Sequence, residues 1–219
     1  MATAPANPSP ALISPALIST SRADLCLEFA NSRYWRGTGE PTETLKSLDD
    51  VFTWVALANA LDAGTVENLK ARWPRGEGDA ATLAQIIALR EALYRTFTAV
   101  AQHASPQARD LELLNRALAA APPRAQLIAH DGAYLWRVEN LKPEISDLLA
   151  PILWTAGDML AEPRRDRVRL CANEKCVWLF LDDSKSGTRR WCAMSACGNR
   201  AKAHRHYERK KKESERRAR

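Results

Sequence analysis

The chain has 219 residues, of which 46% are hydrophobic and 26% charged, a composition typical of a globular protein with one core and a small appended module. No apolar run approaches the ~20 residues that a membrane span needs. The first twenty residues also lack the basic start and unbroken apolar stretch of a secretory signal. These observations argue against a membrane protein and predict a cytoplasmic protein in a reducing compartment.

The net charge of +6 is distributed unevenly along the chain. Residues 164–219 contain eighteen Lys and Arg against seven Asp and Glu, a balance of +11, whereas residues 1–163 have a balance of −5. An acidic body joined to a basic end predicts that the basic end binds a polyanion. A solvated charge run is the alternative, but it does not explain the arginines that lie among the last four cysteines.

The part before this basic end divides into a leader and a helical body. Residues 1–21 are rich in Pro, Ala and Ser and lack aromatic residues, which predicts a disordered leader. Asp24 is the predicted cap of a short buried helix, and glycine and proline predict a loop over residues 33–45. Apolar residues then recur at helical spacing, which predicts helices over about 48–61, 65–73, 79–104 and from Ser105–Pro106 onward.

The pattern changes near residue 125. Two short runs, AQLIAH and AYLWRVEN, flank Asp131–Gly132, which predicts a β-hairpin. Pro143 opens the last helix of the body, and Pro151 is expected to kink that helix or to split it in two. The predicted fold class of residues 22–163 is therefore mainly α with a small β-hairpin (α+β).

Four cysteines near the C-terminus form two pairs with equal spacing. Cys171 and Cys176 enclose four residues, Cys192 and Cys197 enclose four more, and fifteen residues separate the pairs. Two close pairs of soft ligands from separate segments predict a structural zinc site with four cysteine ligands, and so short a segment needs such a metal to fold. Two disulfides or free core thiols are the alternatives, which a reducing compartment disfavours. Cys26 is left as a lone buried thiol.

The cysteine segment resembles a known family. The runs CANEKCVWLF, RRWCAM and CGNRAK, which begin at Cys171, Arg189 and Cys197, are similar to the CGNR zinc finger, although Ala193 stands where that family often has Ser. This finger usually follows a mostly helical ABATE domain, described as a stress-induced transcription regulator. The segment DLCLEFANS resembles the opening of that domain, with Glu28 in place of its usual Asp. The resemblance implies a transcription regulator with an ABATE-like domain over 22–163.

The resemblance also implies that residues 164–219 form a zinc finger that ends in a basic helix. The residues after Cys197 have helical composition without an apolar stripe, so this helix must be solvated or held against a partner. Trp191 is expected to pack in a small core with Trp178, Leu179 and Phe180. Arginine binds phosphates through two hydrogen bonds and reads guanine in the major groove. The candidate nucleic-acid contacts are Arg189, Arg190, Asn199, Arg200, Lys202, His204 and Arg205, with Arg200 alternatively bracing a carboxylate such as Asp182.

The residues and the resemblance together predict a DNA-binding transcription regulator with one structural Zn²⁺. The helical domain is expected to sense an unknown small-molecule effector or to form a homodimer. Four scattered histidines and the lack of a glycine-rich phosphate loop argue against an enzyme. Two other classes stay open, namely an RNA-binding or ribosome-associated zinc protein and a protein-interaction module whose finger only attaches the body to a partner.

Overall fold

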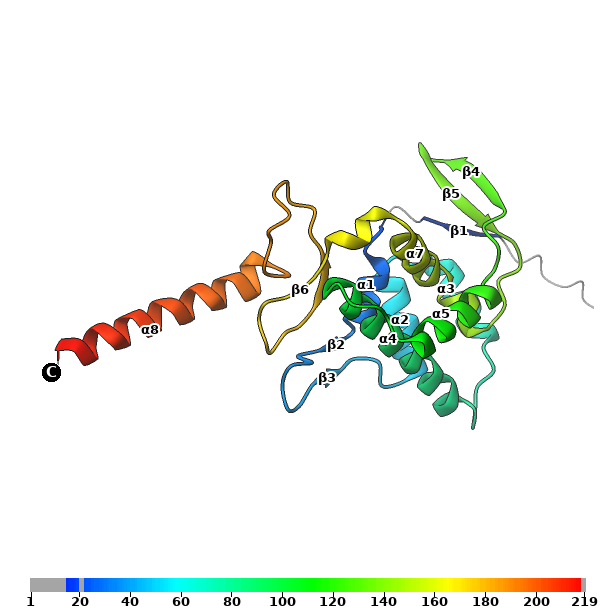
Figure 1. Ribbon diagram of the computed structural model, residues 1–219. Helices are drawn as coiled ribbons and strands as arrows, with labels where there is room; N and C mark the ends of the chain where they lie inside the picture. Colours follow the sequence, from blue (N-terminus) through cyan, green and yellow to red (C-terminus); the bar gives the residue numbers. More distant parts are fainter. Residues whose placement is uncertain (1–14, 20–21, 218–219) are drawn as a thin grey trace, which may run out of the picture.

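The computed structural model describes residues 15–19 and 22–217. A helical body carries the main hydrophobic core, in which the short helix α1 contacts both the long helix α4 and helix α7 (Figure 1). Its helices are α1 (Leu25–Ala30), α2 (Leu48–Leu57), α3 (Ala63–Arg72), α4 (Asp79–Ala101), α5 (Ala108–Ala120), α6 (Ile145–Leu148) and α7 (Ala150–Ala161).

The helix ends follow local chemistry, with some departures from the sequence-based expectation. The Asp62 side chain accepts a hydrogen bond from the Thr65 N–H, so the cap of α3 is Asp62 and not Thr65. Asp24 precedes α1 but makes no side-chain cap hydrogen bond. The chain divides at Leu149 between α6 and α7, and Pro151 lies in the first turn of α7, where a missing N–H costs nothing. The predicted split is thereby confirmed.

A three-stranded antiparallel sheet lies at one side of the body. Strands β4 (Gln126–His130) and β5 (Ala133–Val138) pair around Asp131–Gly132, which confirms the predicted hairpin. A third strand, β1 (Ala16–Ile18), pairs with β5 and buries Ala16 and Ile18. The prediction of a disordered leader over 1–21 is therefore wrong for these three residues, because β5 offers them backbone partners. Residues 1–14 and 20–21 of that leader lie outside the described residues.

A segment that we call the strap, residues 33–43, connects α1 to α2. It contains two short antiparallel strands, β2 (Arg33–Tyr34) and β3 (Thr42–Glu43), within the stretch for which the sequence predicts a loop. Two-residue strands are too short to leave a periodic signal in the sequence.

The cysteine segment begins with a 3₁₀ turn, η1 (Pro163–Arg167), and a two-stranded hairpin of β6 (Val168–Leu170) and β7 (Leu179–Leu181). A turn of π-helix, η2 (Met194–Gly198), then leads into α8 (Asn199–Arg217). Figure 1 shows α8 projecting away from the body, on the side opposite to the three-stranded sheet. Within residues 15–19 and 22–217, none of the helices combines the length and apolar character needed to cross a membrane.

The hairpin of β6 and β7 belongs to the core of the body. Val168, Leu179 and Leu181 are buried in the main hydrophobic cluster, and the two strands contact α1 and α4. The expectation that Leu179 packs in a small core with Trp178 and Trp191 is therefore wrong, because its side chain is buried in the main core. Phe180, which alternates with it along the strand, lies in a second, smaller cluster with the cysteines, Trp178 and Trp191.

Candidate zinc centre and nucleic-acid interface

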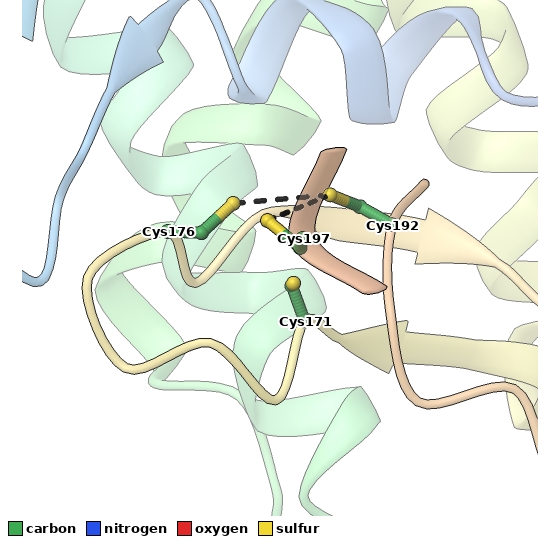
Figure 2. Close-up of side chains that lie close together, drawn as sticks. All are labelled: Cys171, Cys176, Cys192 and Cys197. Carbon is green, nitrogen blue, oxygen red and sulfur yellow. Dashed lines mark hydrogen bonds between the residues drawn. The ribbon is translucent and has the colours of Figure 1, made fainter. Parts of the chain in front are cut away.

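Two separate turns bring the four cysteines together. Cys171 and Cys176 lie in the loop between β6 and β7, which we call the first knuckle. Cys192 and Cys197 lie just before and within η2, in the second knuckle. The four Sγ atoms all lie within 4.8 Å of one another, and Figure 2 shows the side chains pointing toward a common centre.

The sulfur positions fit one tetrahedral zinc ion. Four sulfurs placed about 2.3 Å from zinc at tetrahedral angles are separated by about 3.8 Å. The Cys192 Sγ lies 3.8 Å from the Sγ of Cys176 and 3.8 Å from that of Cys197. All five cysteines of the chain lie in the described part and are free, so the alternative of disulfides is not observed. Four thiolates close the coordination shell, which makes this a structural site.

The thiols share their protons unequally. The pKa of Cys192 is lowered to about 5, because its hydrogen bond with Cys176, and then those with Cys171 and Cys197, outweigh the effect of burial. The same hydrogen bond raises the pKa of Cys176, and burial is the main cause that raises the pKa of Cys171. Asn173 also donates an Nδ2–H to the Cys197 sulfur over 3.4 Å. These hydrogen bonds therefore favour the thiolate of Cys192 over those of Cys171 and Cys176.

The loop after β7 is held by its own acidic residue. Asp182 is fully buried and accepts hydrogen bonds from the N–H and Oγ–H of Ser184 and from the N–H of Arg189. The hydrogen bonds from Ser184 are the main cause that lowers the pKa of Asp182. Asp182 therefore caps the backbone of its own turn.

Gly198 has a packing role at the second knuckle. It does not adopt a positive φ, so a left-handed turn does not explain glycine at this position. A Cβ at this position would lie 2.7 Å from the Met194 sulfur and 3.4 Å from the Trp191 ring. Glycine therefore lets the Met194 side chain lie directly against the start of the helix, and a larger residue would require that flexible side chain to shift.

A basic cleft of about 530 Å³ opens between the first knuckle and the start of α8. Four of the predicted nucleic-acid contacts line this cleft, namely Arg190, Arg200, His204 and Arg205. The first knuckle adds two polar residues that the sequence does not predict as contacts, Asn173 and Lys175. Lys175 follows the acidic Glu174, which also lines the cleft, and this neighbouring pair gives no net charge signal.

The other three predicted contacts lie outside the cleft lining. Arg189 donates its Nε–H to the Trp191 carbonyl over 2.9 Å and a second N–H to the Cys192 carbonyl, and it stacks on Phe180. Its guanidinium therefore braces the second knuckle. Asn199 donates to the Ser195 carbonyl over 3.3 Å, and Lys202 is exposed on α8.

Arg200 contacts the body and not a carboxylate of the finger. Its guanidinium carbon lies 4.7 Å from the ring centroid of Trp35, in the strap. The alternative that Arg200 braces Asp182 is therefore not supported, since Asp182 is bonded within its own turn. No local sequence signal could have identified Trp35, because it is far from Arg200 along the chain.

A helical body joined to a four-thiolate metal site and a basic helix defines a zinc-binding protein as the class. Residues 23–163 match the ABATE family, whose description is "Putative stress-induced transcription regulator". Residues 167–210 match the CGNR zinc finger. The chain therefore belongs to the ABATE family and carries a CGNR zinc finger behind the ABATE domain, which confirms both resemblances. No curated protein matches the chain.

Proposed function

We propose that the protein is a DNA-binding transcription regulator in which zinc holds a basic cleft against the DNA backbone. The basic cleft itself carries the proposal. It gathers Lys175, Arg190, Arg200 and Arg205 from three segments, against the single carboxylate of Glu174. Guanidinium groups bind phosphate oxygens through paired, charge-assisted hydrogen bonds. Such a cluster is the electrostatic footprint of a protein that contacts nucleic acid.

The metal centre joins the two sides of this cleft. Lys175 lies beside Cys176 in the first knuckle, whereas Arg190 and Arg200 flank Cys192 and Cys197 in the second. Zinc bound to all four thiolates would fix the distance between the two knuckles and the direction of α8. We propose a binding role and not a catalytic one, because four protein ligands leave zinc no open position for a substrate.

Two rival functions remain as outcomes of the test. A backbone-binding cleft also suits structured RNA, since phosphate contacts carry little sequence information. A protein-interaction module would use the same surface for an acidic partner. DNA is the partner that we propose because the ABATE family is described as regulating transcription.

The test is equilibrium binding of the zinc-loaded full chain to pooled duplex DNA and to structured RNA, measured by fluorescence anisotropy at several salt concentrations. We expect DNA affinity to fall with salt at a log–log slope of roughly −0.9 for each phosphate contacted. Arg190→Ala and Arg205→Ala should each weaken binding and reduce that slope by up to about 0.9. Arg116→Ala, the same change at an exposed site on α5, is the matched control and should leave both values unchanged.

Tighter binding to RNA than to DNA at equal salt would replace the proposal with an RNA-binding function. Failure to bind either nucleic acid at low salt would reject both and favour a protein partner.

A further inference from the structure

The strap of the helical body lies directly against the first knuckle of the zinc finger, residues 167–210, which we call the zinc module. The Gly37 N–H donates to the Lys175 carbonyl over 3.3 Å, and a Cβ on Gly37 would lie only 1.6 Å from the Glu174 carbonyl oxygen. No other residue than glycine permits so close a backbone approach. The Tyr34 ring also packs on Trp178, with 5.3 Å between ring centroids.

Buried charges fasten the strap to the body. Arg90 of α4 is fully buried and donates two hydrogen bonds to the Glu43 carboxylate, over 2.5 and 2.6 Å. Arg36 donates two more to Glu91 of α4, over 2.7 and 2.9 Å. Bidentate arginine–carboxylate pairs fix orientation as well as distance. The strap is therefore a rigid part of the body that reaches the zinc module.

Trp35 is the strap residue that packs against the cysteine cluster. Its side chain packs in the small cluster formed by Cys176, Cys197 and their neighbours, and its backbone has a φ of 55°. A bulky residue rarely adopts this left-handed conformation, and such strain persists only where the surroundings enforce it. The Trp35 ring lies under the guanidinium of Arg200, a residue in the first turn of α8.

We propose that Trp35 is a positioning residue for nucleic-acid binding. By contacting the Arg200 guanidinium, Trp35 lets the helical body set the direction of that side chain in the basic cleft. This inference rests on the proposed function. The strap, and not the metal alone, then determines whether Arg200 is held in its place in the cleft lining. A change of conformation in the body that moves the strap would withdraw the support of Arg200 and weaken binding.

The expected size of the effect follows from the contact. An arginine has several rotatable bonds, and holding it before binding removes part of the entropy cost of complex formation. A partly exposed cation–π contact corresponds to roughly a two- to fivefold change in an equilibrium constant. We therefore expect Trp35→Ala to weaken DNA binding roughly two- to fivefold.

A first experiment tests the contact without any nucleic acid. The Nε–Hε resonance of Arg200, assigned by its loss in Arg200→Ala, should show an upfield ring-current shift in the zinc-loaded full chain. Trp35→Ala should abolish this shift, and Trp35→Phe should restore part of it. An unchanged resonance in Trp35→Ala would overturn the proposal.

A second experiment is a double-mutant cycle on DNA affinity with Trp35→Ala, Arg200→Ala and the double variant. If Trp35 acts through Arg200, Trp35→Ala weakens binding in the wild-type background and has no further effect in the Arg200→Ala background. Zinc content and melting temperature of each variant show whether the module is intact. Tyr134→Ala, at an exposed site on β5, is the aromatic control and should bind as the wild type does.

The outcomes separate this inference from the proposed function. Equal penalties in both backgrounds would show that Trp35 only supports the fold, and tighter binding by Trp35→Ala would show that the strap sequesters Arg200. Either result overturns the positioning role while DNA binding stands. A wild-type protein that binds no nucleic acid contradicts the proposed function and, with it, the positioning role. The Nε–Hε resonance of Arg200 still decides in that case whether the strap holds this side chain.

Discussion

The five thiols of the chain lie in two different environments, which give them different chemistry. Burial raises the pKa of Cys26 to about 12, so this side chain stays protonated in the core. Hydrogen bonds with the neighbouring cysteine sulfurs lower the pKa of Cys192, which favours its thiolate form. Metal binding requires the deprotonated form.

Because Cys192 lies in the metal site and Cys26 does not, we predict that their substitution affects zinc content differently. Cys192→Ala should reduce bound zinc well below one ion per chain, because the site loses one of its four thiolate ligands. Cys26→Ala is the matched control and should retain one zinc. The measurement is elemental analysis by mass spectrometry after gel filtration without chelator. Equal zinc content in the two variants would contradict the assignment of the site.

The candidate site shows what sequence can specify at the scale of single residues. Ligand spacing predicts all four cysteines, because chelation imposes that spacing. Charge alone does not separate Arg189 from Arg190, since the geometry that turns Arg189 onto Phe180 arises only in the folded loop. The sequence does not predict Trp35 and Lys175 as site residues, because only the folded chain brings them close to the start of α8.

At the scale of elements, the strap depends on ionised carboxylates. Burial by itself would raise the pKa of Glu43 and of Glu91, but their hydrogen bonds with Arg90 and Arg36 outweigh it, so both pKa values are lowered. A carboxyl group whose pKa is lower in the folded state stabilises the fold above its unfolded pKa of about 4.3. That contribution is lost as pH falls through the folded pKa.

We therefore predict that stability decreases as pH falls below about 5, and that Glu43→Gln reduces this dependence. Urea unfolding of both proteins at a series of pH values measures the difference. Loss of zinc in acid affects both proteins alike, so it cancels in the comparison. The variant should be less stable near neutral pH, because Arg90 is buried and loses its charged partner. A constant difference between the two proteins at all pH values would contradict this role of Glu43.

The elements themselves are predictable to the extent that they are long. The helical spacing from Asp79 onward locates α4 to within a few residues, and Pro151 marks the division between α6 and α7. Strands β1, β2 and β3 have two or three residues each, which is shorter than any detectable period. β1 exists because β5 supplies its backbone partners, and only the folded chain brings these segments together.

At the scale of the whole molecule, the zinc-binding segment is not a separate domain, because part of it packs in the core of the body. Asn31 of the body is buried and pairs its amide with both the N–H and the carbonyl of Leu179, over 3.0 and 2.8 Å. The Tyr94 hydroxyl donates to the Val177 carbonyl over 2.8 Å. These bonds join the end of α1 to β7 and join α4 to the first knuckle. The hairpin that carries Cys171 and Cys176 at its turn is thus part of the body.

The last prediction concerns where the chain can be divided. From sequence we expect residues 24–162 to fold alone, but a chain ending at Pro163 lacks Val168, Leu179 and Leu181 and leaves the Asn31 amide without partners. Each buried Val or Leu contributes about 1.5–3 kcal/mol. Three of them amount to a large part of the roughly 5–15 kcal/mol that stabilises a domain.

A chain ending at Ser184, with Cys171→Ser and Cys176→Ser, keeps β6 and β7 but lacks the second knuckle and α8. We predict that it unfolds cooperatively in urea, as measured by circular dichroism, whereas the chain ending at Pro163 does not. Equal midpoints for the two chains would show that the body needs neither strand. The hairpin would then be an attachment to the body and not a part of its core.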